Sequence, residues 1–379
     1  MDIIYKIQEI LAQKDIKHYR INKSVKKSTE LFYIKRELDI TRSTDITDCS
    51  VTVYRDFEAN GIKMRGHAAA MIFPDMTDEE ISKTLSDAYY AASFVKNKYY
   101  ELPQKSNKHT NQYPEAEYDL TNEAFKTAKA LFSAEEPDSV SFINSCEVFA
   151  RRSHVRIVTS EGIDVQYVKY TFNGEFVAQA VSNGQDVELH TQFSYGEPPE
   201  MQLTEKVRHA LKTVKDRAEA VSPPPSGKYS VILVGEDVSS VLGYYVSRTQ
   251  GGMIYAGYSS FKKGCLIQGE SENFTSERLQ LNLKATHHYS AEGIPMKDRI
   301  LTKDGKLETI HCGARFAHYL DIEPTGDYSS VECLNGTESF EDMKASKNKV
   351  LLISSFSDFQ TDAFTGQFGG EIRLAYLFE

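Results

Sequence analysis

Three consecutive prolines interrupt this sequence between Ser222 and Gly227. Such a segment continues neither a helix nor a central strand, because proline lacks a backbone N–H and fixes φ. The chain has 379 residues, which is more than one typical domain. We therefore predict two domains that meet at this break, residues 1–221 and residues 228–379.

The segment directly after the break, from Tyr229 to Gly252, has the pattern of a buried strand, a tight turn, a helix and a glycine loop. We expect the helix over residues 236–248. Glu236 and Asp237 lie in its first turn, where acidic side chains complement the helix dipole. No His-x-x-x-His pair occurs in the sequence, so no helix presents two histidines to one zinc ion.

Helices and an antiparallel sheet are predicted before the break. Apolar residues at helical spacing predict a helix over residues 2–14. Alternating runs over residues 19–73 predict an antiparallel meander with a turn at Asn60-Gly61. Thr77 and Glu80 have the spacing of a capping box, which predicts that a second helix begins there.

The same criteria extend to the rest of the chain. Before the break we expect a helix over residues 121–134, a strand over 147–159, a hairpin over 163–180 that turns at Asn173-Gly174, and a helix over 200–220. After it we expect short strands between glycine turns, for example over residues 299–302, 350–354 and 371–378. The predicted fold class is α+β. An N-terminal antiparallel sheet with packed helices precedes a C-terminal mainly-β domain that carries a strand-helix insertion.

The charge balance and the cysteines exclude several classes of protein. With 54 acidic and 44 basic residues the net charge is −10, which argues against binding nucleic acid through its phosphates. Five scattered cysteines, an odd number, favour a reducing compartment over a disulfide framework. Charged residues interrupt the N-terminal segment, and no run reaches about 18 apolar residues. We predict a cytoplasmic protein without a membrane or nucleic-acid partner.

His287, His288 and Glu292 form the one tight cluster of metal-type ligands in the sequence. Adjacent histidines on a strand point to opposite faces, so they do not readily share one metal ion. A nucleophile elbow and a phosphate-binding loop are also missing from the sequence. An autonomous hydrolase that uses these three residues is therefore kept as an alternative only.

Four motifs in the second half occur in a characteristic order. They are Gly251-Gly252 followed by Ser259-Ser260-Phe261, the segment 291–295 around Glu292-Gly293, the segment 314–327, and the segment 362–368. Together they resemble the TldD/TldE family of peptidases (U62-like). The TldE branch of that family is also called PmbA and has been labelled a modulator of DNA gyrase.

The resemblance implies a heterodimeric metalloprotease that acts on unfolded or small modified peptides. In the TldD branch a His-Glu-x-x-x-His helix holds zinc, and the TldE branch lacks these ligands. In this sequence Gly235 and Ser240 stand where the two histidines would be, and Glu236 stands at the glutamate. The chain therefore resembles the metal-free branch, with no catalytic residue and no cofactor of its own. Zinc is expected in a TldD-like partner.

From this resemblance we expect a non-catalytic subunit, inactive alone, that walls one side of a peptide chamber. Its partner would be a TldD-like subunit or a second copy of itself, in a dimer. A binding protein that modulates DNA gyrase remains an alternative. Family members normally continue with further strands beyond the position of Phe378-Glu379. The residues expected to face substrate or partner are Gly251, Gly252, Ser259, Ser260, Glu292 and Gly293.

Overall fold

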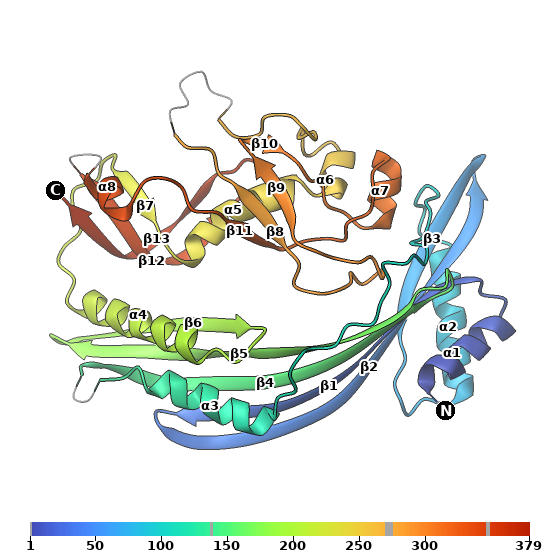
Figure 1. Ribbon diagram of the computed structural model, residues 1–379, viewed down its shortest axis with the longest axis horizontal. Coiled ribbons are helices and arrows are strands. Elements are labelled where there is room, and N and C mark those ends of the chain that lie inside the picture. The colour runs from blue at the N-terminus through green and yellow to red at the C-terminus, as the bar shows by residue number, and fades with distance from the viewer. Residues whose placement is uncertain (1, 137–138, 270–275, 346–348) are drawn as a thin grey trace.

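The computed structural model describes residues 2–136, 139–269, 276–345 and 349–379 (Figure 1). Its first half is a curved sheet of six antiparallel strands in the order β3-β2-β1-β4-β5-β6. The strands are β1 (His18–Ile34), β2 (Glu37–Ala59), β3 (Ile62–Met71), β4 (Ser141–Thr159), β5 (Asp164–Ser182) and β6 (Gln185–Tyr195). The helices are α1 (Ile3–Gln13), α2 (Asp78–Ala92), α3 (Leu120–Phe132) and α4 (Glu200–Ala218).

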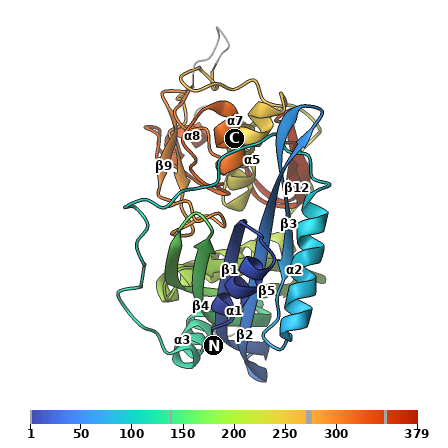
Figure 2. The same cartoon turned by 90° about the vertical axis from the view of Figure 1, so that its right-hand side faces the viewer.

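The helices and the second half of the chain use opposite faces of β1. Ile21 lies in the apolar cluster with α1 and α2, and Leu31 lies in the cluster with α3 and α4. Arg20 and Asn22 line a cavity on the other face, because successive side chains of a strand point in opposite directions. Figures 1 and 2 show the second half lying above the sheet.

The second half contains two small sheets. One has the order β10-β9-β8-β11 and the other the order β13-β12-β7, in which β12 pairs in parallel with β7. The strands are β7 (Ser230–Leu233), β8 (Leu281–Lys284), β9 (Arg299–Lys303), β10 (Lys306–Leu307), β11 (Ser330–Cys333), β12 (Val350–Thr361) and β13 (Phe368–Phe378). The helices are α5 (Glu236–Arg248), α6 (Gly251–Tyr255), α7 (Ala314–Leu320) and α8 (Phe340–Ala345).

The predicted α+β class is confirmed, and so are several local signals. The capping box of Thr77 and Glu80 is present with both hydrogen bonds, and Asn60-Gly61 turns the chain between β2 and β3 with positive φ at both residues. Helix α5 has the predicted bounds. The change from the first sheet to the other two falls between α4 and β7, and the division into two domains stays a prediction.

The predicted hairpin at Asn173-Gly174 is wrong. Strand β5 runs without a break through this dipeptide, and the turn to β6 lies at Asn183-Gly184, where φ is 51° and 75°. Gly174 is instead a point of close approach between strands, because a Cβ atom there would lie 1.9 Å from the carbonyl oxygen of Glu147 on β4. The predicted glycine loop at Gly251-Gly252 is also wrong, since these residues begin the short helix α6.

The second half is tied to α4 by a polar contact. Asp216 of α4 accepts hydrogen bonds from Lys212 of the same helix and from the Tyr376 hydroxyl on β13. Lys212 also donates to that hydroxyl. Among the described residues, no helix is both long and apolar enough to cross a membrane.

Candidate functional site

Helix α5 begins at the positions that the sequence aligns with a zinc helix. Gly235 precedes the helix with φ 68° and ψ −141°, a conformation that is costly for any residue with a Cβ atom. The Glu236 side chain is 79% exposed and pairs with Lys206 at 2.7 Å. Ser240 is exposed, and its hydroxyl lies 3.4 Å from the carbonyl oxygen of Glu236. The first turn of α5 is therefore a solvated helix start with a surface ion pair.

A hollow of about 530 Å³ separates the start of α5 from the sheet. We call it the α5 hollow. The Asn173 side-chain oxygen beside it is buried and has no hydrogen-bond partner. Its lining residues come from β4, β5, β6, α4 and α5, and they are Phe149, Asn173, Gly174, Glu175, Gln192, Phe193, Ser194, Tyr195, Lys206 and Glu236.

The side chains around the α5 hollow do not fit a zinc site. Zinc in proteins takes three or four ligands from His, Cys, Asp and Glu. The hollow offers only the carboxylates of Glu175 and Glu236, and the latter is paired with Lys206. Across the described part of the chain, no three such residues are grouped to hold a metal ion. No catalytic step through a metal is therefore derived for this chain.

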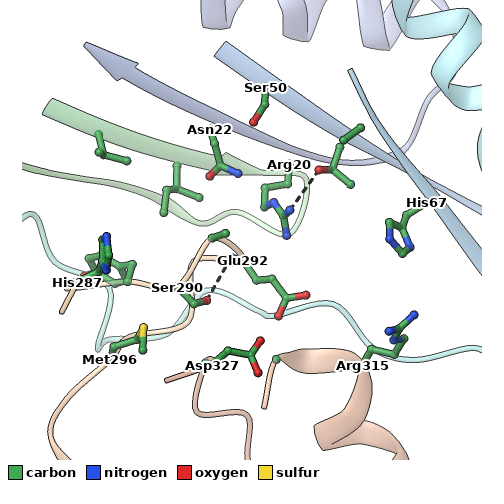
Figure 3. Close-up of a pocket in the computed structure, with 18 of the residues that line it drawn as sticks. Arg20, Asn22, Ser50, His67, His287, Ser290, Glu292, Met296, Arg315 and Asp327 are labelled. Atoms are coloured by element: carbon green, nitrogen blue, oxygen red, sulfur yellow. Dashed lines mark hydrogen bonds between the residues drawn. The ribbon is translucent and has the colours of Figure 1, made fainter. Parts of the chain in front are cut away.

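A larger cavity of about 890 Å³ lies between the sheet and the second half (Figure 3). We call it the central cavity. In the view of Figure 3, its roof is formed by side chains of β1 to β5, and its floor by the segments 286–296, 313–316 at the start of α7, and 326–329. Its charged and polar lining residues include Arg20, Asn22, Ser50, Thr52, His67, His287, Ser290, Glu292, Arg315 and Asp327.

Arg20 reaches into the central cavity from β1. Its Nη1 donates to the Tyr54 hydroxyl at 3.3 Å and its Nη2 to the Thr52 hydroxyl at 3.2 Å. Its Nε is buried without a partner. The guanidinium is therefore held by two neutral groups of β2, and the positive charge has no ion-pair partner among the described residues.

A second cationic group lines the same cavity as Arg20. Arg315, in the first turn of α7, donates from Nη1 to the Asn97 side-chain oxygen at 2.8 Å. The same amide lies 3.4 Å from Nδ1 of His67. Burial lowers the pKa of His67, and the charges of Arg315 and Arg20 lower it further. The His67 ring is therefore neutral at pH 7 beside two guanidinium groups.

Glu292 lies on the floor of the central cavity, as Figure 3 shows. Its Oε2 accepts the backbone N–H of Ala314 at 2.8 Å, at the start of α7. Burial raises the pKa of Tyr54 and of Tyr100, and the nearby Glu292 charge adds to the rise at both hydroxyls. Both tyrosines therefore stay protonated and can donate hydrogen bonds into the cavity.

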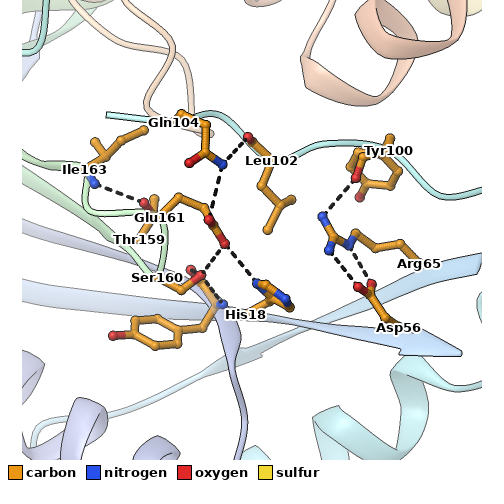
Figure 4. Close-up of polar contacts among 11 residues, drawn as sticks. His18, Asp56, Arg65, Tyr100, Leu102, Gln104, Thr159, Ser160, Glu161 and Ile163 are labelled. Atoms are coloured by element: carbon orange, nitrogen blue, oxygen red, sulfur yellow. Dashed lines mark hydrogen bonds and ion pairs between the residues drawn. The ribbon is translucent and has the colours of Figure 1, made fainter. Parts of the chain in front are cut away.

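Two polar contacts, one around the buried Arg65 and one partly buried, support the wall of the central cavity (Figure 4). Arg65, 2% exposed, binds the Asp56 carboxylate with two hydrogen bonds of 2.6 and 2.7 Å, and its Nη1 donates to the Tyr100 carbonyl oxygen at 2.8 Å. His18 contacts Glu161 at 2.9 Å across the start of β1. These contacts hold the segment that carries Tyr100 against β2 and β3.

The structure does not bring the predicted substrate-facing residues into one place. Glu292 lines the central cavity, and Gly293 follows it with its carbonyl oxygen 3.0 Å from His109 Nε2. The other four lie outside the cavity lining. Gly251 and Gly252 pack against Cys312 and Phe316, Ser259 is buried and Ser260 is exposed.

The two adjacent histidines also point to different partners. His287 lies 2.8 Å from the Lys169 amine, whereas the His288 ring packs edge-on against Tyr167 with 5.6 Å between ring centroids. Burial lowers the pKa of both imidazoles, and the Lys169 charge lowers that of His287 further. Neither ring has a hydrogen bond to Glu292 among the described residues, so the three do not form a catalytic group.

Sequence reasoning missed Arg20, His67 and Arg315. A signal for Arg20 exists, because it alternates along β1 with the buried Ile21 and so belongs to the opposite face. No local signal places the other two beside it, since they come from β3 and α7.

Comparisons with known proteins give a family model for the second half and a shared fold for the whole chain. Residues 226–379 match the family model described as the PmbA/TldA metallopeptidase C-terminal domain. TldE from Thermococcus kodakarensis has a TM-score of 0.76 at 14% identity, over 99% of this chain and 88% of that chain. A proposed modulator of a DNA gyrase from Thermotoga maritima has a TM-score of 0.70 at 14% identity, over 99% and 89%.

A third solved structure, a proposed modulator of DNA gyrase from Bacteroides thetaiotaomicron, has a TM-score of 0.69 at 16% identity, over 100% of this chain and 88% of that chain. Comparison with curated proteins gives no match. The TM-scores of these three structures show that they share the fold of this chain.

Proposed function

We propose that this chain is a zinc-less, non-catalytic subunit of a TldD/TldE-type metalloprotease complex. The match of residues 226–379 to the PmbA/TldA metallopeptidase C-terminal domain and the fold shared with TldE support this proposal. Its substrates would be unfolded or small modified peptides. Its partner would be a TldD-like subunit that carries zinc, or a second copy of this chain. A cytoplasmic location is part of the proposal, and it is supported by the free state of all five cysteines.

The observation that carries this proposal is the first turn of α5. Gly235 has no side chain to offer a metal, and its backbone conformation strains any residue that would replace it. Ser240 is a poor zinc ligand, and Glu236 is engaged by Lys206 on α4. A general base at Glu236 would need a metal-bound water to activate, and the donors around it do not fit a metal. Glu236 therefore acts as a helix-start charge.

The rival hydrolase finds no support in the geometry, because His287, His288 and Glu292 have separate partners. A role in modulating DNA gyrase is suggested by the descriptions of two similar structures, but no feature of the described residues favours it. A pull-down that recovers gyrase and no protease homologue would favour that role over ours.

Metal analysis combined with a peptidase assay tests the proposal. The purified chain should contain no stoichiometric zinc and should not cleave an unfolded peptide alone. Mixed with a homologue that carries the His-Glu-x-x-x-His helix, it should form a complex that cleaves the peptide. The Glu236→Gln variant should support the same partner-dependent rate. Stoichiometric zinc together with activity in the isolated chain would overturn the proposal.

A further inference from the structure

The cationic side of the central cavity has no acidic partner of its own. No carboxylate of the described residues forms an ion pair with Arg20 or Arg315, whose hydrogen bonds go to hydroxyl and amide oxygens. Elsewhere in the first sheet, Arg65 and Arg156 are each bound by two oxygens of one carboxylate. Guanidinium groups that are not paired with a carboxylate keep the capacity to bind one, so an anion in this cavity would be stabilised.

The two guanidinium groups also keep hydrogen-bond donors for a ligand. A guanidinium has five N–H groups, and the contacts of Arg20 use two of them, both to uncharged hydroxyls. Arg315 uses one of its five for Asn97. A carboxylate is the anion whose two oxygens match the planar fork of arginine. His67, held by the same Asn97 amide as Arg315, offers a ring nitrogen beside them.

The floor of the central cavity has the opposite charge. Asp327 lies there beside Glu292, and its Oδ1 accepts from the Gln250 amide at 3.2 Å. Apolar side chains of Val155, Ile157 and Met296 complete the lining. A ligand that suits both charges has a carboxylate at one end and an amine at the other. The volume of about 890 Å³ is within the range of small-ligand sites.

We propose that the central cavity binds a short peptide through its free carboxyl terminus, with the carboxylate between Arg20, His67 and Arg315. The amino end of the peptide then points to Glu292 and Asp327. The charges of the cavity suggest a ligand with a carboxylate at one end and an amine at the other. The choice of a peptide as that ligand rests on the proposed function. The site is complete within one chain, so it needs no partner subunit.

Calorimetric titration of the isolated chain with four probes tests the ligand side. Trialanine should bind, and trialanine amide should bind about tenfold more weakly or worse, because it lacks the charged hydrogen-bond acceptor. N-acetyl-trialanine should also bind more weakly, since it has no amine for the acidic floor. Free alanine distinguishes an amino-acid site from a peptide site and should bind more weakly than trialanine.

Variants test the protein side with a matched control. Arg20→Gln and Arg315→Gln should each weaken trialanine binding about tenfold. Arg55→Gln should leave it unchanged, because Arg55 follows Tyr54 on β2 and stacks over Tyr89 on the helix face of the sheet. Thermal unfolding of each variant verifies that the variant is folded. If a variant does not fold, the titrations of the unaltered chain with the four probes still test the proposal.

Several outcomes would overturn the inference. They are equal affinity for trialanine and its amide, no heat of binding with millimolar trialanine, or unchanged binding in both arginine variants. Alanine that binds as tightly as trialanine would refute the choice of a peptide, and equal binding of N-acetyl-trialanine would refute the orientation. The proposed function is tested separately, by partner-dependent cleavage, so either proposal can fail without the other.

Discussion

The α5 hollow and the central cavity are both enclosed between the curved sheet and the second half, yet their charges are arranged differently. At the α5 hollow the acidic Glu236 and the basic Lys206 satisfy one another at the surface. In the central cavity Arg20 and Arg315 are bound by neutral groups, and Glu292 is bound by a backbone N–H. Opposite charges thus form an ion pair in the first region, whereas among the described residues no ion pair joins them in the second.

This difference separates a region whose charged side chains pair at the surface from a region whose arginines form no ion pair. An exposed ion pair contributes little to the free energy of folding, because water solvates the two charged groups when the pair is broken. The charged side chains of the central cavity keep their positions only if the surrounding groups are fixed. The hydrogen bonds between Arg65 and Asp56 fix the cavity wall. The comparison therefore predicts that substitutions at the cavity wall cost more than substitutions at the start of α5.

The largest effect is expected from Asp56→Ala, which leaves the buried Arg65 without its counter-charge. We expect the free energy of unfolding in urea to fall by about 3–5 kcal/mol. The matched control is Asp45→Ala, which removes an exposed partner of Lys27 and should change stability by about 0.5 kcal/mol or less. Equal losses in the two variants would mean that the cavity wall does not depend on this contact.

The same ion pair predicts a dependence on pH. Burial alone would raise the pKa of Asp56, but the hydrogen bonds and charge of Arg65 outweigh it and lower that pKa. The stabilisation is therefore present above the unfolded-state pKa of about 3.9 and is lost as pH falls through the lower pKa of the folded state. Urea unfolding between neutral and acid pH should show this loss in the unaltered chain and less of it in Asp56→Ala.

Two glycines of the sheet cannot be replaced by a larger residue. A Cβ atom would lie 1.8 Å from the Ala92 carbonyl oxygen of α2 at Gly66, on the helix face of β3, and 1.9 Å from the Glu147 carbonyl oxygen at Gly174, beside the α5 hollow. Alanine at either position should destabilise the fold by about 3 kcal/mol, because α2 must move away from β3 at Gly66 and β4 from β5 at Gly174. Gly196→Ala, with open space around it, is the control. A neutral Gly174→Ala would show that the sheet is looser under α5.

A smaller loss is expected from Gly235→Ala. The conformation at φ 68° and ψ −141° strains a residue with a Cβ atom, and the cost should be about 2 kcal/mol in urea unfolding. Ser240→Ala, an exposed change in the same helix, should stay within about 0.5 kcal/mol. If Gly235→Ala were neutral, the backbone could accept a histidine there, and the α5 hollow would be one substitution closer to a metal site.

The smallest losses of stability are expected for substitutions of Glu292 and Glu236, one from each region. Glu292→Ala removes the acceptor for the Ala314 N–H and should cost about 1–2 kcal/mol in thermal or urea unfolding. Glu236→Ala removes half of an exposed ion pair and should cost about 0.5 kcal/mol or less. The reverse order of these two losses would contradict the contrast drawn between the regions.

Short-range patterns in the sequence predicted several local elements correctly. The bounds of α5 follow from apolar spacing and acidic residues in its first turn, and the start of α2 follows from the Thr77 and Glu80 capping box. These signals are readable because the interactions that produce them span one helical turn. The mixed α+β class follows in the same way from the periods of successive segments.

Only the tertiary structure decided where the chain turns after β5 and which residues share a site. Asn173-Gly174 and Asn183-Gly184 are the same dipeptide, and pairing of β5 with β4 and β6 selects the second as the turn. Arg20 and Arg315 line one cavity because β1 and α7 face each other across it. Such contacts depend on segments far apart in the chain. The sequence by itself therefore determined most of the local elements, while the packing of the two halves determined the cavity.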